Sequence, residues 1–104
     1  MKIDLSGQKI LVTGASRGIG RAVAEQLAEA GAQVAVHYNR NANTAQHVVD
    51  NIGKGAAAFQ ADLSKPVEVI QLFENVLAKF GRLHAIVNNA GIDISAEVEG
   101  EDID

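Results

Sequence analysis

The sequence predicts an α/β fold, in which helices connect the successive strands of a parallel β-sheet. Short apolar runs alternate with stretches of helical periodicity between residues 8 and 88. The first of these runs is continuously apolar, which is typical of strands that are buried on both faces of a parallel sheet. The intervening stretches are long enough for the right-handed helical crossovers that parallel strands require. With 104 residues, the chain is the size of one small domain.

Two strand–helix units are expected in the first half of the chain. Residues 8–13 form the first strand, and the helix after it ends at Gly31. Residues 33–38 form the second strand, and a glycine-rich turn at residues 53–55 closes the helix that follows. The expected apolar stripes are Ile19, Val23, Leu27 and Ala30 in the first helix, and Ala45, Val48, Val49 and Ile52 in the second.

A third unit and a fourth strand are expected in the second half. Residues 56–60 form a weaker strand, because they are poor in β-branched side chains. Ser64 is a candidate N-cap for the next helix, and Pro66 lies in its first turn, where a missing N–H is tolerated. Residues 84–88 form the fourth strand. The expected stripe of the third helix is Ile70, Phe73, Leu77 and Phe80, and Gly81 ends that helix.

A glycine loop lies between the first strand and the first helix. Residues 13–20 read TGASRGIG, with glycines at the spacing G-x-x-x-G-x-G. Glycines allow a tight turn, a close approach of a pyrophosphate to the backbone and close packing of helix on strand. The helix N-terminus then presents free N–H groups to the phosphates. The loop therefore predicts a nucleotide site, although a strand–helix turn that binds nothing has a similar composition.

Three further turns follow the other strands. They are Asn39-Arg40, Asp62-Leu63 and Asn89-Ala90-Gly91. In open parallel sheets, ligands bind outside the carboxyl ends of the strands, near the point where the strand order reverses. Because four polar or glycine-bearing turns meet at one such edge, we expect the binding site there. Asp62 could instead be a simple turn former before a helix.

Composition excludes several other classes of function. The net charge is −4, and six of the thirteen acidic residues follow residue 92, which we interpret as a solvated terminus. The remaining charge is nearly balanced, with little aromatic surface for base stacking, so nucleic-acid binding is not expected. The sequence has no cysteine, no membrane span and no leader, which predicts a cytoplasmic protein. His37, His47 and His84 are expected on separate elements, so we interpret them as packing or surface residues and predict no metal site.

The combination of TGASRGIG at 13–20, Asp62-Leu63 and Asn88-Asn89-Ala90-Gly91 closely resembles the short-chain dehydrogenase/reductase family. The resemblance covers residues 5–92 nearly continuously. It implies a Rossmann-type, doubly wound parallel sheet of strand order 3-2-1-4, incomplete at residue 104. It also implies binding of NAD or NADP for hydride transfer to ketones or from alcohols. Members similar to 3-oxoacyl-[acyl-carrier-protein] reductases provide one model for the substrate, a small carbonyl or alcohol compound.

The resemblance also assigns cofactor contacts. Residues of the glycine loop would line the pyrophosphate and adenosine ribose, Asp62 would accept from the adenine amino group, and Leu63 would contact adenine through its backbone. An acid about 20 positions after the glycine loop binds the 2′-OH of NAD, whereas an Arg there accepts the 2′-phosphate of NADP. Arg40 occupies this window, which predicts NADP. The complete expected set is Gly14, Ser16, Arg17, Gly18, Ile19, Gly20, Asn39, Arg40, Asp62, Leu63, Asn89, Ala90 and Gly91.

The family's catalytic Asn, Ser, Tyr and Lys would lie beyond residue 104. Tyr38, the only tyrosine, ends the second strand and has no Lys at helical spacing. We therefore expect residues 1–92 to be an NADP-binding half-domain and residues 93–104 to lead to an absent catalytic half. The alternative is a stand-alone NADP-binding module without chemistry of its own. With one helix on one face and an open edge at 84–88, we also expect association, as a homo-oligomer.

Overall fold

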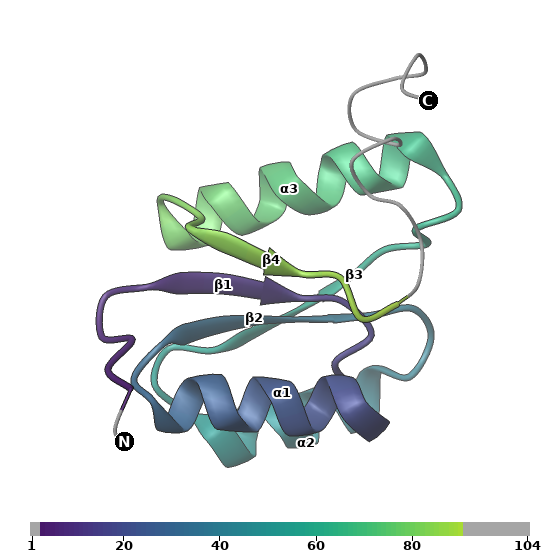
Figure 1. Cartoon of the computed structure of the whole chain (residues 1–104). Helices are drawn as coiled ribbons and strands as arrows, with labels where there is room; N and C mark the ends of the chain where they lie inside the picture. The colour runs from purple at the N-terminus through teal and green to yellow at the C-terminus, as the bar shows by residue number, and fades with distance from the viewer. Residues whose placement is uncertain (1–2, 91–104) are drawn as a thin grey trace.

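The computed structural model describes residues 3–90, in which four parallel strands form one sheet of order β3-β2-β1-β4 (Figure 1). Both the parallel α/β fold and the strand order predicted from the sequence are confirmed. Expected features at residues 91–104, including Gly91 and the acidic terminus, lie outside the described part. The elements are β1 (Lys9–Val12), α1 (Gly18–Glu29), β2 (Gln33–Tyr38), α2 (Ala42–Ile52), β3 (Ala57–Gln60), α3 (Pro66–Phe80) and β4 (Ala85–Val87).

The helices lie on opposite faces of the sheet, with α1 and α2 on one side and α3 on the other (Figure 1). The side chains of β1 alternate between the two faces of the sheet and so contribute to a hydrophobic core on each face. Ile10 and Val12 face α1 and α2, whereas Leu11 faces α3. The second core is closed by Phe80, whose ring meets that of Phe59 edge-on at a centroid distance of 5.9 Å. The sheet therefore forms the middle of three layers, as its apolar strands require.

The buried face of α1 differs from the predicted stripe. Gly20, Ala24 and Ala28 are buried, whereas the side chain of Ile19 is 75% exposed. Val23 and Leu27, which belong to the predicted stripe, flank the buried face and contact the core. Small side chains on the buried face bring the helix close to the sheet, and this close approach turns Ile19 outward at the carboxyl edge.

The predicted stripe of α3 is wrong by one position over most of its length. Val69, Leu72 and Val76 are buried together with the expected Phe80, whereas Ile70 and Leu77 are each 45% exposed. Phe73 contacts the core from the side. Because α3 is apolar around much of its circumference, two adjacent stripes satisfy the helical period equally well. Contact with the sheet selects one of them.

The start of α3 also differs from the prediction. Its N-cap is Lys65, which makes no side-chain cap bond, and Pro66 is the first helical residue, as predicted. The hydroxyl of Ser64 instead donates to Asp62 Oδ1 at 2.7 Å. The expected stripe of α2 is confirmed, since Ala45 and Val48 are buried and their two partners contact the core. Within residues 3–90, no helix has the length and apolarity that a membrane crossing needs.

Candidate functional site

The carboxyl ends of the four strands lie at one edge of the sheet, and each is followed by a loop that the sequence analysis singled out. β1 leads into the glycine loop, β2 into Asn39-Arg40, β3 into Asp62-Leu63 and β4 into Asn88-Asn89-Ala90. β1 lies between β2 and β4 in the sheet. The glycine loop is therefore central, and the strand order reverses beside it, where ligands bind to folds of this kind.

Two glycines of this loop adopt backbone conformations that other residues rarely adopt. Gly14 has φ 61° and Gly18 has φ 62°. Gly20 is required for a different reason, because a Cβ there would lie 2.2 Å from the carbonyl oxygen of Gly14 and 2.5 Å from the side-chain nitrogen of Asn89. The three glycine positions are thus fixed by the path of the loop and by its contact with the fourth-strand loop.

The N-terminus of α1 has the properties of an anion site. Its N-cap, Arg17, has extended backbone and makes no side-chain cap bond, and α1 has no acidic residue in its first turn. N–H groups of the first helical turn lack intrahelical acceptors, so they are available to a ligand. A Cβ on Gly18 would meet nothing within 4 Å, so open space lies in front of this turn. These features fit the pyrophosphate of a dinucleotide.

The loop after β4 is bound to the glycine loop by side chains. Asn89 Nδ2 donates to the carbonyl of Gly14 at 3.1 Å, and the N–H of Ala90 donates to Thr13 Oγ1 at 3.0 Å. The fully buried Thr13 hydroxyl also lies 3.3 Å from Asn88 Oδ1. Asn88 thus joins neighbouring segments. Thr13 is not among the site residues predicted above, and its signal in the sequence is a hydroxyl at the end of a buried apolar strand.

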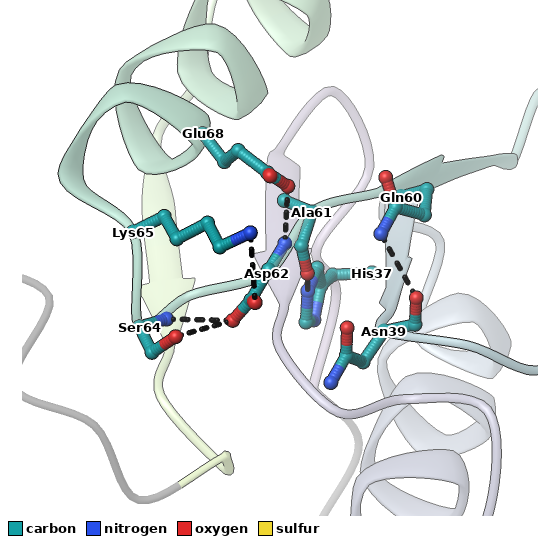
Figure 2. A network of polar contacts seen from close by, with 8 residues as sticks. All are labelled: His37, Asn39, Gln60, Ala61, Asp62, Ser64, Lys65 and Glu68. Atoms are coloured by element: carbon teal, nitrogen blue, oxygen red, sulfur yellow. Dashed lines mark hydrogen bonds and ion pairs between the residues drawn. The ribbon is translucent and has the colours of Figure 1, made fainter.

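The loop after β3 is ordered by a network around Asp62 (Figure 2). Asp62 Oδ1 accepts from the N–H and the hydroxyl of Ser64, at 3.0 and 2.7 Å, and Lys65 Nζ lies 4.0 Å from Oδ2. The N–H of Asp62 donates to Glu68 Oε1 at 2.8 Å. The two hydrogen bonds from Ser64, with smaller contributions from the charges of Lys65 and Arg40, lower the pKa of Asp62. Asp62 is therefore an ionised turn former, and its carboxylate retains lone pairs for a ligand.

The loop after β2 exposes Asn39 and Arg40. Gln60 Nε2 donates to the carbonyl of Asn39 at 2.9 Å, which holds this turn against the end of β3 (Figure 2). Asn41 accepts from the N–H of Thr44 at 3.2 Å and so caps α2. Arg40 thus sits in a turn that is fixed on both sides, and Arg17 is exposed in the glycine loop at the same edge.

His37, interpreted above as a packing or surface residue, connects two loops of the site. Its side chain is 2% exposed, and both ring nitrogens bond to backbone groups of neighbouring loops. Nδ1 accepts from the N–H of Gly14 at 2.9 Å, and Nε2 lies 2.9 Å from the carbonyl of Ala61. Burial lowers the pKa of His37, with partial opposition from the hydrogen bond to Ala61. The available signal was a polar residue inside an apolar strand.

The site therefore combines an anion-binding helix terminus, exposed arginines and a turn with an ionised carboxylate. Leu63 is buried among the residues under α3, so its backbone is its available contact with a ligand. Tyr38 packs against the core on the α1 and α2 side. Among residues 3–90 there is no group of three or more His, Asp or Glu side chains that could hold a metal ion. These groups can bind a nucleotide.

Comparison with known proteins gives consistent similarities. The family model described as short chain dehydrogenase matches residues 8–104. A hydroxynaphthalene reductase-like protein Arp2 of Metarhizium majus is 45% identical over 107 residues, covering 97% of this chain and 40% of its own length. A short-chain type dehydrogenase/reductase of Picea abies is 44% identical and covers 85% of this chain and 36% of its own. The chain thus spans about 40% of the length of these curated relatives.

Solved structures agree with this similarity. A short chain dehydrogenase from Burkholderia cenocepacia in complex with NADP has a TM-score of 0.80 at 49% identity, covering 85% of this chain and 37% of its own. A blue fluorescent protein from a metagenomic library, in complex with NADPH, has a TM-score of 0.81 at 39% identity, covering 86% and 38%. Both similarities therefore cover most of this chain but less than half of each solved protein.

Proposed function

The chain belongs to the short-chain dehydrogenase family, and from this premise we propose that it is the NADP(H)-binding part of a reductase that transfers hydride between NADPH and a carbonyl or alcohol substrate. The observation that carries the proposal is the glycine loop with the uncapped N-terminus of α1. Gly14 and Gly18 adopt positive φ, and open space lies where a Cβ of Gly18 would stand. Such an arrangement accepts a pyrophosphate by direct contact with backbone N–H groups.

The preference for NADP is supported by charge. Arg40 follows β2, where dinucleotide-binding folds recognise the adenosine ribose, and no acidic residue accompanies it at residues 38–41. Arg17 is exposed at the same edge. Guanidinium groups make charge-assisted hydrogen bonds to a phosphate and have no acceptor for a ribose hydroxyl. The two solved neighbours described above carry NADP and NADPH.

The remaining assigned residues would hold the other parts of the cofactor. We place Asp62 and the backbone of Leu63 at the adenine, and Asn89, Ala90 and Gly91 at the nicotinamide-side ribose. Asn89 uses its Nδ2 on Gly14, so its contribution to the ligand would come from its remaining polar groups. The bound nicotinamide would supply the hydride, and the residues described here bind and orient it.

In our proposal, the catalytic groups of the reaction lie outside these 104 residues. Tyr38 is half-buried against the core at the end of β2, which does not suit a proton donor to a substrate. In our proposal the chain is the amino-terminal half of a larger enzyme, which acts as a homo-oligomer on a small molecule in the cytoplasm. A stand-alone NADP-binding module is the second candidate, favoured by the fact that the assigned cofactor loops lie within residues 13–91.

Cofactor titration and intact mass test both candidates. The fluorescence of NADPH should rise and reach saturation when the purified protein binds it. The Kd should be lower for NADPH than for NADH. An intact mass well above 10.9 kDa together with NADPH oxidation in the presence of carbonyl compounds would support the reductase. Saturable NADPH binding by a protein of 10.9 kDa without turnover would favour the module, and absence of binding to either cofactor would remove both.

A further inference from the structure

His37 connects two loops of the proposed cofactor site. Its Nδ1 accepts from the N–H of Gly14, the first glycine of the loop after β1. Its Nε2 bonds to the carbonyl of Ala61, which directly precedes Asp62, as Figure 2 shows. The backbone of His37 and of the next residue adds two more bonds, from Ala15 N–H to the carbonyl of His37 at 2.9 Å and from Ala61 N–H to the carbonyl of Tyr38 at 3.2 Å. The end of β2 thus holds both neighbouring loops.

These bonds define the protonation state of the ring. A backbone N–H can only donate, so Nδ1 must carry a lone pair, and a carbonyl can only accept, so Nε2 must carry the proton. Only the neutral Nε2–H tautomer meets both requirements, as burial also favours. A second proton, on Nδ1, would face the N–H of Gly14 and would remove the hydrogen bond between them.

Gly14 is thereby fixed on both sides. Its N–H is held by His37 and its carbonyl by Asn89, and its φ of 61° is maintained between these two anchors. Resting on the proposed function, we propose that His37 is a positioning residue for NADP(H), which holds the pyrophosphate loop and the adenine-side loop at a fixed spacing through its neutral imidazole. The cofactor then binds to two loops that are already aligned. Binding free energy is therefore not reduced by the cost of ordering these loops.

The surroundings of the ring determine how acid acts on it. Charged groups in the loops at this edge are Arg17 in the glycine loop, Arg40 after β2, and Asp62, Lys65 and Glu68 at the β3–α3 turn and the start of α3, whereas Glu74 and Lys79 lie further along α3. Neither ring nitrogen bonds to any of them, since both are used on backbone groups. Acid therefore acts on the imidazole by breaking the bond to Gly14, and affinity for NADPH should fall as the pH drops below the ordinary histidine range.

Two isosteric substitutions separate the two bonds. In His37→Asn, the amide oxygen takes the place of Nδ1 and can still accept from Gly14. In His37→Gln, the amide nitrogen takes the place of Nε2 and can still donate to Ala61, whereas the N–H of Gly14 loses its acceptor. Neither amide titrates near neutrality. His47→Asn is the matched control, because His47 is exposed on α2.

The experiment is NADPH titration of the intact purified protein and of the three variants between pH 5.5 and 8. We expect His37→Gln to bind about tenfold more weakly than the wild type at pH 7.5, the effect of one unsatisfied buried donor. His37→Asn should stay within about threefold, because the bond to Gly14 is kept and the backbone bond from Ala61 N–H to the carbonyl of Tyr38 still holds the second loop. The loss of NADPH affinity in acid should be smaller in His37→Asn than in the wild type. Protonation of the cofactor's own phosphates affects both proteins equally, so it cancels in this comparison. His47→Asn should match the wild type throughout.

A spectroscopic measurement on the wild type does not depend on the folding of variants. Long-range ¹H–¹⁵N NMR should show Nδ1 of His37 unprotonated and Nε2 protonated at pH 7. Equal NADPH affinity in both His37 variants and the wild type, or a ring protonated on Nδ1, would overturn the inference while leaving the proposed function intact. Failure of the wild type itself to bind NADPH would instead overturn the proposed function, and the inference with it.

Discussion

Asn89 Nδ2 donates to the carbonyl oxygen of Gly14 at 3.1 Å, across 75 positions of the chain. This bond closes the glycine loop against the loop after β4. The same two groups crowd Gly20, where a Cβ would lie within 2.5 Å of both. A side chain at position 20 would therefore separate the loops that the bond joins, and the cofactor edge depends on a contact between distant segments.

Gly18→Ala should reduce NADPH affinity at least tenfold, because a methyl group would occupy the open space in front of the α1 N-terminus. Gly81→Ala, at the left-handed C-cap of α3, is the control. The φ values of Gly18 and Gly81 are 62° and 84°, and a Cβ at either position meets nothing within 4 Å. Both variants should therefore lose about 1 kcal/mol of stability from backbone strain. Thermal unfolding and NADPH titration check the pair, and equal affinity in the two variants would contradict the proposed pyrophosphate position.

Arg40→Ala should weaken NADPH binding about 10- to 100-fold, the value of a charge-assisted hydrogen bond to the 2′-phosphate. NADH binding should change less than about twofold, because NADH lacks that phosphate. Arg82→Ala, at an exposed arginine beyond the end of α3, controls for the loss of one positive charge. Titration with both cofactors measures the effect, and an equal loss for NADH and NADPH would assign Arg40 a different role.

Stability should fall as the pH is lowered through the histidine range. The pKa of His37 is lowered in the folded protein from the ordinary value of 6.5 because burial disfavours the charged ring. The unfolded chain therefore binds the proton first, and stability is fully present above about pH 6.5 and lost below it, by at most about 1.4 kcal/mol per pH unit. Urea unfolding of the cofactor-free protein between pH 5 and 8 checks this. The slope should be smaller in His37→Asn, and an unchanged slope would show that another group causes the loss.

The 104-residue chain by itself should associate. Val67 and Ile70 on α3 are 66% and 45% exposed, Leu77 is 45% exposed, and Ile86 on β4 is 43% exposed. In Figure 1, α3 is the one helix on its face of the sheet among the described residues, and Ile86 pairs with Leu11, which faces α3. Sedimentation velocity of the verified chain at micromolar concentration should show species larger than the monomer, and Ile70→Glu should reduce them. Val49→Glu on the opposite face, which is partly buried, would instead destabilise the monomer. A cooperatively unfolding monomer of the unmodified chain would refute the expectation.

The order and type of the elements could be predicted from the sequence because they depend on local patterns. Apolar runs, helical periodicity and glycine stops follow one another within a few residues, and right-handed crossovers then leave few sheet topologies. The carboxyl edge with its four loops follows from the same topology. The glycines at 14, 18 and 20 could be singled out for the same local reason, since their spacing is contained in eight residues.

Tertiary structure alone decided the contacts that His37 and Asn89 make at that edge, and which faces of α1 and α3 are buried. The stripe of α3 at Val69, Leu72 and Val76 was selected by the sheet, since periodicity permits its neighbour at Ile70 and Leu77 equally well. The roles of His37 and Asn89 depend on Gly14, which is 23 and 75 positions away in the chain. A hydrogen bond over such a separation has no local signature, because it exists only once the strands have set the distance between its two groups.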